Sequence, residues 1–178
     1  MALEIERRFL VTSEAWRSQV AWQARLRQGY LTAGPDGFTV RVRLGDGRAW
    51  LTLKANASAD GLVRHEFEYP IPPSDAESLL ALAPRQLSKC RYGLTLPGGD
   101  WVLDVFEADN APLVVAEVEL QDADPDQGKL QLPPWCGLEI TGRAELSNAG
   151  LAWQPLATWP DSRRQQLLAG LGSAPGPA

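Results

Sequence analysis

Apolar and polar residues alternate along most of this chain. The period of two that is typical of a β-strand runs through eight segments, at residues 3–11, 24–31, 37–45, 48–56, 61–70, 85–96, 99–108 and 112–121. Between them, Gly45-Asp46-Gly47 and Pro97-Gly98-Gly99 are typical of tight hairpins. Eight strands joined by hairpins favour an antiparallel sheet or barrel over alternating strands and helices.

Helical patterns are few. Ser74-Asp75-Ala76-Glu77 has the spacing of a capping box, and apolar residues follow at helical spacing up to Ala83. We also expect a short helix after Thr12-Ser13-Glu14, and others near 147–153 and 161–171, the last with Asp161 as N-cap. The pattern therefore predicts an α+β chain that is mainly β, with a few flanking helices.

The length of 178 residues indicates one domain with a short extension. We expect residues 1–158 to form the domain and residues 159–178 to form a C-terminal helix and a disordered tail. The closing GLGSAPGPA, from about residue 172, is too rich in small residues to pack.

Charge and composition exclude several classes of function. The net charge of −5 argues against generic nucleic-acid binding. No apolar run approaches the ~18 residues of a membrane span, and the N-terminus lacks the basic region of a signal peptide, so we expect a cytoplasmic protein. Cys90 and Cys136 are too few for a disulfide framework and lie in no zinc-binding pattern.

Charged residues of one sign recur at alternate positions of the predicted strands. Residues i and i+2 of a strand lie on one face about 7 Å apart, where two like charges repel by roughly 2 kcal/mol at an effective dielectric constant near 20. For a single strand, a solvated sheet face is the simpler interpretation. The repetition over several strands favours a wet barrel interior that binds a highly charged ligand. The like-charged pairs are Arg41 and Arg43, Glu66 and Glu68, Lys89 and Arg91, and Glu117 and Glu119.

These residue types are suited to phosphate chemistry. Arginine and lysine neutralise phosphate oxygens, and grouped carboxylates bind hard divalent cations such as Mg²⁺ or Mn²⁺, which bridge phosphates. The alternation therefore predicts a site for a polyanion and metal ions.

An ordered series of short segments resembles the CYTH superfamily, the triphosphate tunnel metalloenzymes, and in particular its short bacterial inorganic triphosphatases. The N-terminal EIERRFLV is similar to the family's ExExK signature, and the similarity continues to about residue 155. The further segments are QGYL, RVR, TLK, HEFEYP, KCRY, LDVFE, AEVEL, EIT and SNAGLA.

The resemblance implies an eight-stranded antiparallel β-barrel that forms a tunnel, and it assigns roles by position. The implied metal-side carboxylates are Glu4, Glu6, Asp104, Glu117 and Glu119. The implied phosphate-binding residues are Arg8, Arg41, Arg43, Lys54, Lys89 and Arg91, with Tyr30 as a residue that partly closes one tunnel end or else packs in the core or at the rim. The implied catalytic carboxylates are Glu4, Glu6 and Glu119, together with Glu66 and Glu68 as supporting groups in the tunnel.

Two positions depart from the family pattern. Arg8 stands where the signature has lysine, because strand parity places Arg8, and not Arg7, on the face of Glu4 and Glu6. Glu145-Leu146 stands where bacterial relatives carry Arg-Tyr, so a basic contact is missing or Arg143 replaces it. His65 has the opposite parity to Glu66, so we expect it to point away from the tunnel.

The resulting prediction is metal-dependent hydrolysis of inorganic tripolyphosphate, with Mg²⁺ or Mn²⁺ as cofactor. The alternatives are an adenylate cyclase, a hydrolase of thiamine triphosphate or nucleoside triphosphates, and a polyphosphate-binding module without catalysis. The general base is either a tunnel glutamate or metal-bound water. The expected partner is a triphosphate-containing small molecule, with no nucleic acid and no membrane, and the resemblance also implies a homodimer.

Overall fold

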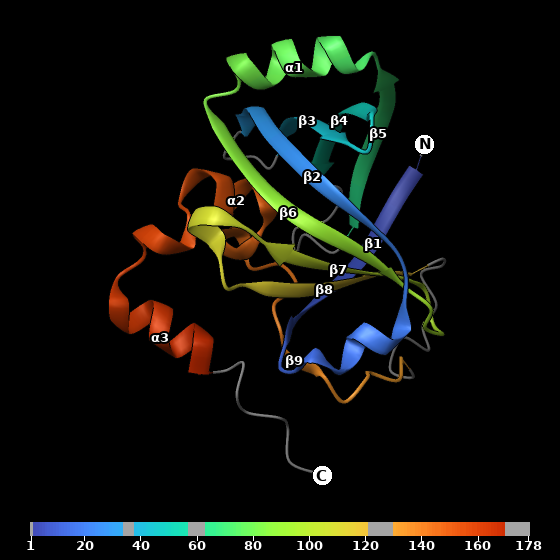
Figure 1. Cartoon of the computed structure of the whole chain (residues 1–178), viewed down its shortest axis with the longest axis vertical. Helices are drawn as coiled ribbons and strands as arrows, with labels where there is room; N and C mark the ends of the chain where they lie inside the picture. The colour runs from blue at the N-terminus through green and yellow to red at the C-terminus, as the bar shows by residue number, and fades with distance from the viewer. Residues whose placement is uncertain (1, 34–37, 57–62, 121–129, 170–178) are drawn as a thin grey trace.

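The computed structural model contains nine strands within the residues that it describes (Figure 1). The structure describes residues 2–33, 38–56, 63–120 and 130–169, with backbone only for 2–5, 33, 56, 63 and 64. The strands are β1 Ala2–Val11, β2 Val20–Ala33, β3 Thr39–Gly45, β4 Arg48–Asn56, β5 Val63–Ile71, β6 Arg85–Leu94, β7 Asp100–Phe106, β8 Val114–Glu119 and β9 Cys136–Glu139.

All the pairings between these strands are antiparallel, in the order β5-β4-β3-β2-β6-β7-β8-β1-β9. β5 also pairs with residues 2–5 of β1, whereas β8 pairs with residues 6–10 of the same strand. The sheet therefore curls until β5, at one end of the strand order, meets β1 over a short, staggered stretch. The predicted mainly β, antiparallel class is confirmed.

Most of the strand predictions agree with the structure to within two residues at each end, with two larger differences, and the predicted strand residues 37, 61, 62 and 121 lie outside the described part. β2 begins at Val20 and is 14 residues long, because its N-terminal end continues the ladder with β6 as far as Leu94. β9 was not predicted, since four residues are too short to show a periodicity. It pairs with β1 at Phe9 and Val11.

The hairpin predicted at Gly45-Asp46-Gly47 is confirmed. Asp46 and Gly47 both have positive φ, 51° and 71°, and link β3 to β4. Positive φ at both central residues is the geometry of the turn that matches strand twist. Gly98 and Gly99 also have positive φ in the predicted turn between β6 and β7.

The helices lie outside the sheet (Figure 1). Figure 1 shows α1 across one end of the strands, and α2 and α3 on one side. The predicted helices near residues 14, 74 and 147–153 are confirmed, the first as a 3₁₀ helix. The helix predicted at 161–171 is confirmed over 161–169, and residues 170 and 171 lie outside the described part. The α-helices are α1 Pro73–Leu82, α2 Asn148–Trp153 and α3 Asp161–Ala169, and the 3₁₀ helices are η1 Glu14–Gln19, η2 Ala108–Asn110, η4 Ala144–Leu146 and η5 Leu156–Thr158.

Two predicted helix caps are wrong. α1 begins at Pro73 with Pro72 as N-cap and no side-chain cap bond, because proline is well placed in the first turn, where its missing N–H costs nothing. The Ser74 hydroxyl instead donates to Asp75 at 3.3 Å. Asp161 is the first residue of α3 and accepts from Arg164 at 2.7 Å.

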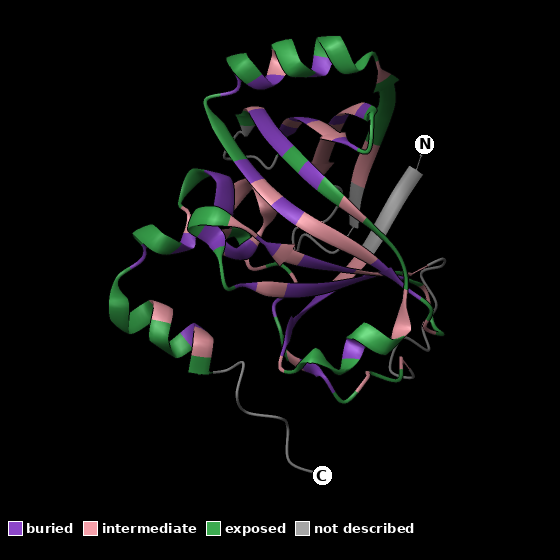
Figure 2. Cartoon of the chain, in the orientation of Figure 1, coloured by how far each residue is buried: buried purple, intermediate pink, exposed green. Residues whose placement is uncertain are grey.

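Buried residues recur along the strands and on the helices that cover them (Figure 2). On the outer side of the sheet, under α1, Val42 of β3 packs with Ala76 and Leu80. A second cluster contains Trp16, Trp101 and Trp135. A third cluster lies on the inner side, where Leu151 of α2 and Leu167 of α3 join Phe106, which shares the face of Lys89. The helices and loops therefore cover the outer apolar face and one end of the interior, and the charged residues occupy the rest of the inner face. None of the helices in the described part of the chain has the length and apolar character to cross a membrane.

Candidate functional site in the barrel interior

Strand register places the predicted site residues on one face of the curled sheet. Residues that lie directly opposite each other in a ladder point to the same side. Arg41 lies opposite Tyr30 and Thr52, Arg91 opposite Asp104, and Glu119 opposite Glu6. The described residues of the predicted site share this inner side: Glu6, Arg8, Tyr30, Arg41, Arg43, Lys54, Glu66, Glu68, Lys89, Arg91, Asp104, Glu117 and Glu119. Glu4 pairs with Arg64 through the backbone, and its side chain lies outside the described part.

The first charged cluster is centred on Asp104, which is fully buried. Its Oδ2 accepts from Lys89 at 2.5 Å, and Arg91 donates to both of its oxygens at 2.7 and 2.8 Å. Arg91 also reaches Glu117 at 3.2 Å. Lys89 is itself fully buried, and its second acceptor is Asn148 at 2.9 Å. These charges are satisfied by one another and by α2.

Arg8 joins this cluster from β1. Its Nε donates to Glu117 at 3.3 Å, and its Nη1 donates to the carbonyl of Leu146 at 3.0 Å. Arg8 is 5% exposed, and its Nη2 has no partner within the described structure. A buried, unpaired guanidinium donor is costly unless a ligand supplies the acceptor.

The second charged cluster lies on β3, β4 and β5. Glu68 accepts from Arg43 at 2.8 Å, from Arg41 at 3.4 Å and from Thr52 at 2.8 Å. Glu66 pairs with Lys54 at 2.6 Å and lies 3.8 Å from Arg41. Sequence reasoning did not select Thr52 as a site residue, although it shares the face of Lys54. Thr52 is fully buried and bridges Arg41 and Glu68.

The two clusters influence each other across the interior. Burial and the like charge of Arg41 lower the pKa of Arg43 to about 10, and Arg91 on the other wall also lowers it. Burial raises the pKa of Glu119, and Glu66 and Glu6 raise it further. The residues that the alternation predicted on separate strands therefore form one electrostatic unit.

The pKa values within the first cluster follow from burial and charge. Burial alone would raise the pKa of Asp104, but Arg91 and Lys89 hold it well below its usual range. Burial, helped by Arg91, lowers the pKa of Lys89 to about 7, although Asp104 opposes this. Burial alone would lower the pKa of Arg91, but Asp104 and Glu117 raise it above its usual value.

Tyr30 lies at an end of the interior that α2 covers. It is 2% exposed and belongs to the apolar cluster that contains Leu151 and Ala152 of α2. Its hydroxyl accepts from Gln28 at 3.2 Å. Asn148, which binds Lys89, begins α2. Gln28 and Asn148 were not selected from the sequence as polar groups of the site. Gln28 could have been found because it shares a strand face with Tyr30, whereas no sequence pattern pointed to Asn148.

Three other sequence expectations concern residues near the site. Arg7 lies outside the interior and pairs with Glu139 at 2.7 Å. Arg143 pairs with Glu145 at 2.9 Å and does not contact the described charges of the interior. His65 lies opposite Ala55, on the side away from Lys54 and Glu66.

The described carboxylates differ in their fitness to hold a metal ion. No three described His, Cys, Asp or Glu side chains already form a metal-binding group. Asp104 and Glu117 are bound by bases. Glu6 and Glu119 face each other in register, without a described ion pair. The raised pKa of Glu119 reflects burial and an excess of negative charge around it, which a divalent cation would relieve.

Comparisons with known proteins agree with this geometry. The family model of the CYTH domain matches residues 2–131. The inorganic triphosphatase of Acetivibrio thermocellus is 34% identical over 157 residues, which are 87% of this chain and 96% of that protein. The inorganic triphosphatase of Nitrosomonas europaea is 38% identical over 151 residues, covering 84% of this chain and 96% of that protein.

Solved structures give the same result. The crystal structure of the inorganic triphosphatase NE1496 has a TM-score of 0.61 and 34% identity, over 85% of this chain and 95% of that one. The structure of the PH1012 protein from Pyrococcus horikoshii has a TM-score of 0.58 at 21% identity, over 71% of this chain and 83% of that one, and supports the fold alone.

Proposed function

Because the chain belongs to the CYTH domain family, we propose that it hydrolyses inorganic triphosphate inside the curled sheet with the help of a divalent metal ion. One observation carries the proposal. Six bases and their carboxylate partners from seven strands face one interior. The two relatives named as inorganic triphosphatases cover most of the chain, which supports the choice of substrate.

The bases would hold the phosphate oxygens. Arg8 Nη2 and Arg41 Nε are buried donors that have no acceptor within the described structure. A phosphate oxygen satisfies such a donor with a charge-assisted hydrogen bond. Arg43, Lys54 and Arg91 face the same interior, so a linear chain of three phosphates would contact several of them at once, whereas Lys89 is fully buried behind Asp104.

A metal ion would fit the carboxylates that form no described ion pair with the bases. Glu6 and Glu119 are the described candidates, and Glu4 is a third by parity. Mg²⁺ or Mn²⁺ bound there would neutralise phosphate charge and polarise the phosphoanhydride bond. Glu117 and Asp104, predicted on the metal side, would position Arg8, Lys89 and Arg91 in the free protein.

Hydrolysis breaks one phosphoanhydride bond by attack of water and releases phosphate and pyrophosphate. The proton of the attacking water needs an acceptor, and the predicted catalytic carboxylates are Glu4, Glu6, Glu66, Glu68 and Glu119. Glu66 and Glu68 bind Arg41, Arg43 and Lys54 in the free protein, which supports a positioning role for these two carboxylates. Catalysis then rests on positioning and electrostatic stabilisation of the phosphoryl group.

Phosphate release from tripolyphosphate, ATP and thiamine triphosphate, each with Mg²⁺, with Mn²⁺ and with EDTA, tests the proposal. We expect tripolyphosphate to be hydrolysed fastest, and only with metal. Cyclic AMP formed from ATP would instead indicate a cyclase. Binding of tripolyphosphate without turnover would indicate a binding module. A cytoplasmic location and a homodimer stay predictions.

Glu119→Gln provides the sharpest variant. It removes one charge from the proposed metal side and is nearly isosteric, so we expect at least about a hundredfold loss of turnover. Glu77→Gln is the matched control, because Glu77 lies on α1 and pairs with Arg27 outside the interior. Full metal-dependent turnover in Glu119→Gln would refute the metal assignment, whereas no activity in either variant or the parent would refute the function.

A further inference from the structure

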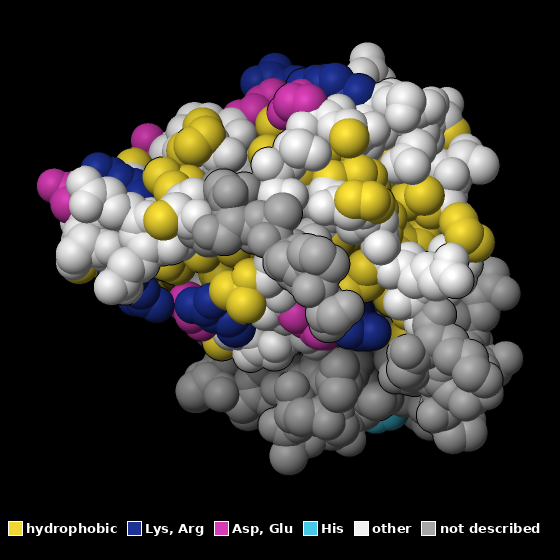
Figure 3. All heavy atoms as spheres, turned by 90° about the horizontal axis from the view of Figure 1, so that it is seen from below, with side chains coloured by type: hydrophobic (Ala, Val, Ile, Leu, Met, Phe, Trp, Pro, Cys, Tyr) yellow, Lys and Arg dark blue, Asp and Glu magenta, His cyan; other side chains and the backbone are white. Residues whose placement is uncertain are grey.

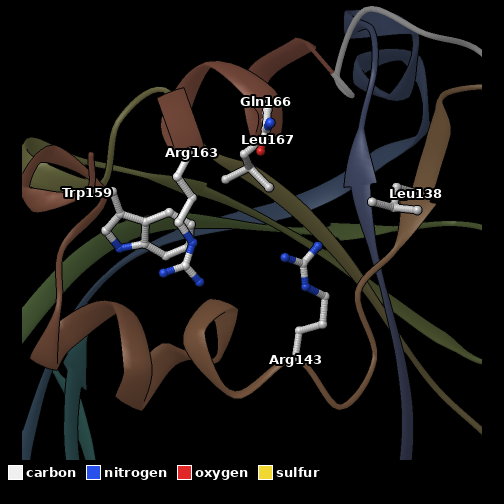
Figure 4. A pocket seen from close by; sticks show the side chains of 6 residues that line it. All are labelled: Leu138, Arg143, Trp159, Arg163, Gln166 and Leu167. Atoms are coloured by element: carbon white, nitrogen blue, oxygen red, sulfur yellow. The ribbon is translucent and has the colours of Figure 1, made fainter. Parts of the chain in front are cut away.

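A cavity lies outside the interior of the curled sheet, between β9, the segment before η4, and α3 (Figure 4). Its volume is about 270 Å³, and it is lined by Leu138, Arg143, Trp159, Arg163, Gln166 and Leu167. None of these residues belongs to the charged set of the interior. Figure 3 shows basic side chains beside hydrophobic ones toward the left of the face seen from below, where α3 lies.

Two arginines extend into this cavity from opposite sides (Figure 4). Arg143 donates through Nε and Nη2 to one oxygen of Glu145, at 3.0 and 2.9 Å. Arg163 Nη2 lies 3.6 Å from the same oxygen. A carboxylate of the chain itself thus lies between the two guanidinium groups, in the position that the oxyanion of a ligand would take.

The ion pairs of Glu145 with Arg143 and Arg163 are weak. The side chains of Arg143, Glu145 and Arg163 are 40%, 31% and 47% exposed. Exposed ion pairs contribute little to stability, because water and salt screen them. A ligand that brings a second charge or an apolar group can therefore displace Glu145.

Apart from Gln166, the remaining residues that line the cavity are apolar. Trp159 is 6% exposed, and its indole N–H donates to the carbonyl of Gln154 at 3.0 Å. The guanidinium of Arg163 lies 4.2 Å from the centre of the Trp159 ring. Leu167 is buried beside it, and Leu138 is exposed at the rim. This wall adds apolar contact area next to the two positive charges.

We propose that this cavity binds a small organic oxyanion, a phosphate or carboxylate carried by a compact aromatic or apolar group. The oxyanion replaces Glu145 between Arg143 and Arg163, and the ring contacts Trp159 and the two leucines. Arginine suits this role because its planar fork binds an oxyanion with two donors. Glu145, which pairs with both arginines, is the one carboxylate described at the cavity, so the cavity lacks the group of carboxylates that would hold a metal ion.

The site is tested by binding of phenyl phosphate to the intact protein, measured by calorimetry and by the chemical shift of the Trp159 indole N–H, which Trp159→Phe assigns. We expect Arg143→Ala and Arg163→Ala each to weaken binding about tenfold, since each removes a charged hydrogen-bond donor. Glu145→Gln should tighten binding about fivefold, because it removes the internal competitor. Inorganic phosphate should bind at least about fivefold more weakly, since it lacks the ring.

Arg164→Ala is the matched control, because Arg164 lies on the same helix, pairs with Asp161 and does not line the cavity. It should leave the affinity unchanged. Equal affinities in Arg143→Ala, Glu145→Gln and the parent would place phenyl phosphate elsewhere, including the barrel interior, and would overturn the proposal. Equal affinity for inorganic phosphate would overturn the role of the apolar wall. Triphosphate turnover is not a readout, so failure of the proposed function has no bearing on this result.

Discussion

At the scale of single residues, each pair of like-charged bases along a strand is balanced by a carboxylate from another strand of the sheet. Glu68 lies between Arg41 and Arg43, and Asp104 lies between Lys89 and Arg91. The repulsion within a pair is therefore offset across the ladder. Removing one partner of such a buried group leaves the other charges uncompensated, which is the costly case.

Asp104→Asn tests this balance. The substitution keeps the shape of the side chain and removes the charge that holds Lys89 and Arg91. We expect the free energy of unfolding to fall by about 3–5 kcal/mol, measured by urea denaturation. Glu77→Gln removes an exposed carboxylate and should change it by less than about 0.5 kcal/mol. Equal stability of Asp104→Asn and the parent would contradict the buried ion pairs.

The two thiols should differ in reactivity. Burial raises the pKa of Cys136 to about 12, and Cys136 is 3% exposed, whereas Cys90 is half-buried. At pH 8 we expect iodoacetamide to modify Cys90 at least about tenfold faster, because the thiolate is the reacting form. Mass spectrometry of the labelled peptides measures this, and urea should make the rates equal. Fast native labelling of Cys136 would contradict its burial.

The same pKa shift has a consequence for stability. An unfolded cysteine loses its proton near pH 8.5, whereas folded Cys136 keeps it to about pH 12. Between these values the folded state holds more protons, so this thiol makes the free energy of unfolding fall as pH rises. The fall in urea midpoint over this window should be smaller in Cys136→Ala than in the parent.

At the scale of elements, the short segments outside the sheet complete the interior as well as covering it. Leu146 of η4 accepts from Arg8 through its carbonyl, and Asn148 at the start of α2 accepts from Lys89. On the opposite wall, α1 packs against β2 and β3. Gly29 of β2 allows this close approach, because an added Cβ would lie 2.7 Å from the Cβ of Ala83 and 2.9 Å from Leu80.

Gly29→Ala should therefore displace α1 or strain the strand. We expect a loss of about 1–3 kcal/mol in the free energy of unfolding, the usual cost of overpacking, measured by urea denaturation. The double variant Gly29→Ala with Ala83→Gly removes the nearest clash and should recover about half of the loss. Additive losses in the double variant would show that α1 does not contact β2 as described.

At the scale of the whole molecule, the interior is close to electrically neutral in the absence of ligand. Six predicted bases face six described carboxylates of the predicted site, and the chain as a whole carries a net charge of −5. A triphosphate brings several negative charges into this space. A cation must accompany it, since unpaired charge is costly where water is limited.

Ligand and metal should therefore stabilise the fold together. A ligand at about a hundred times its dissociation constant adds about 2.7 kcal/mol, so tripolyphosphate with Mg²⁺ should raise the melting temperature by roughly 5–10 °C. Tripolyphosphate with EDTA should raise it much less. Differential scanning fluorimetry measures both, and Glu119→Gln should lose the metal-dependent part. Equal shifts with Mg²⁺ and with EDTA would contradict the need for a cation.

The sequence by itself determined which side chains share a face. Alternation is a local property of a strand, so Arg8 could be separated from Arg7, and Glu66 from His65, without knowledge of the fold. The strands and the Gly45-Asp46-Gly47 turn were predictable for the same reason, since they depend on backbone preferences over a few residues.

Only the tertiary structure decided which charges meet. The partners of Arg8 are Glu117 and the carbonyl of Leu146, more than a hundred residues away, and strand order, not periodicity, brings them together. β9, the role of Asn148 and the cavity between Arg143 and Arg163 escaped prediction because each depends on segments that are distant in sequence and carry no repeating pattern. Local geometry sets the direction of a side chain, whereas its partner is set by the packing of the whole chain.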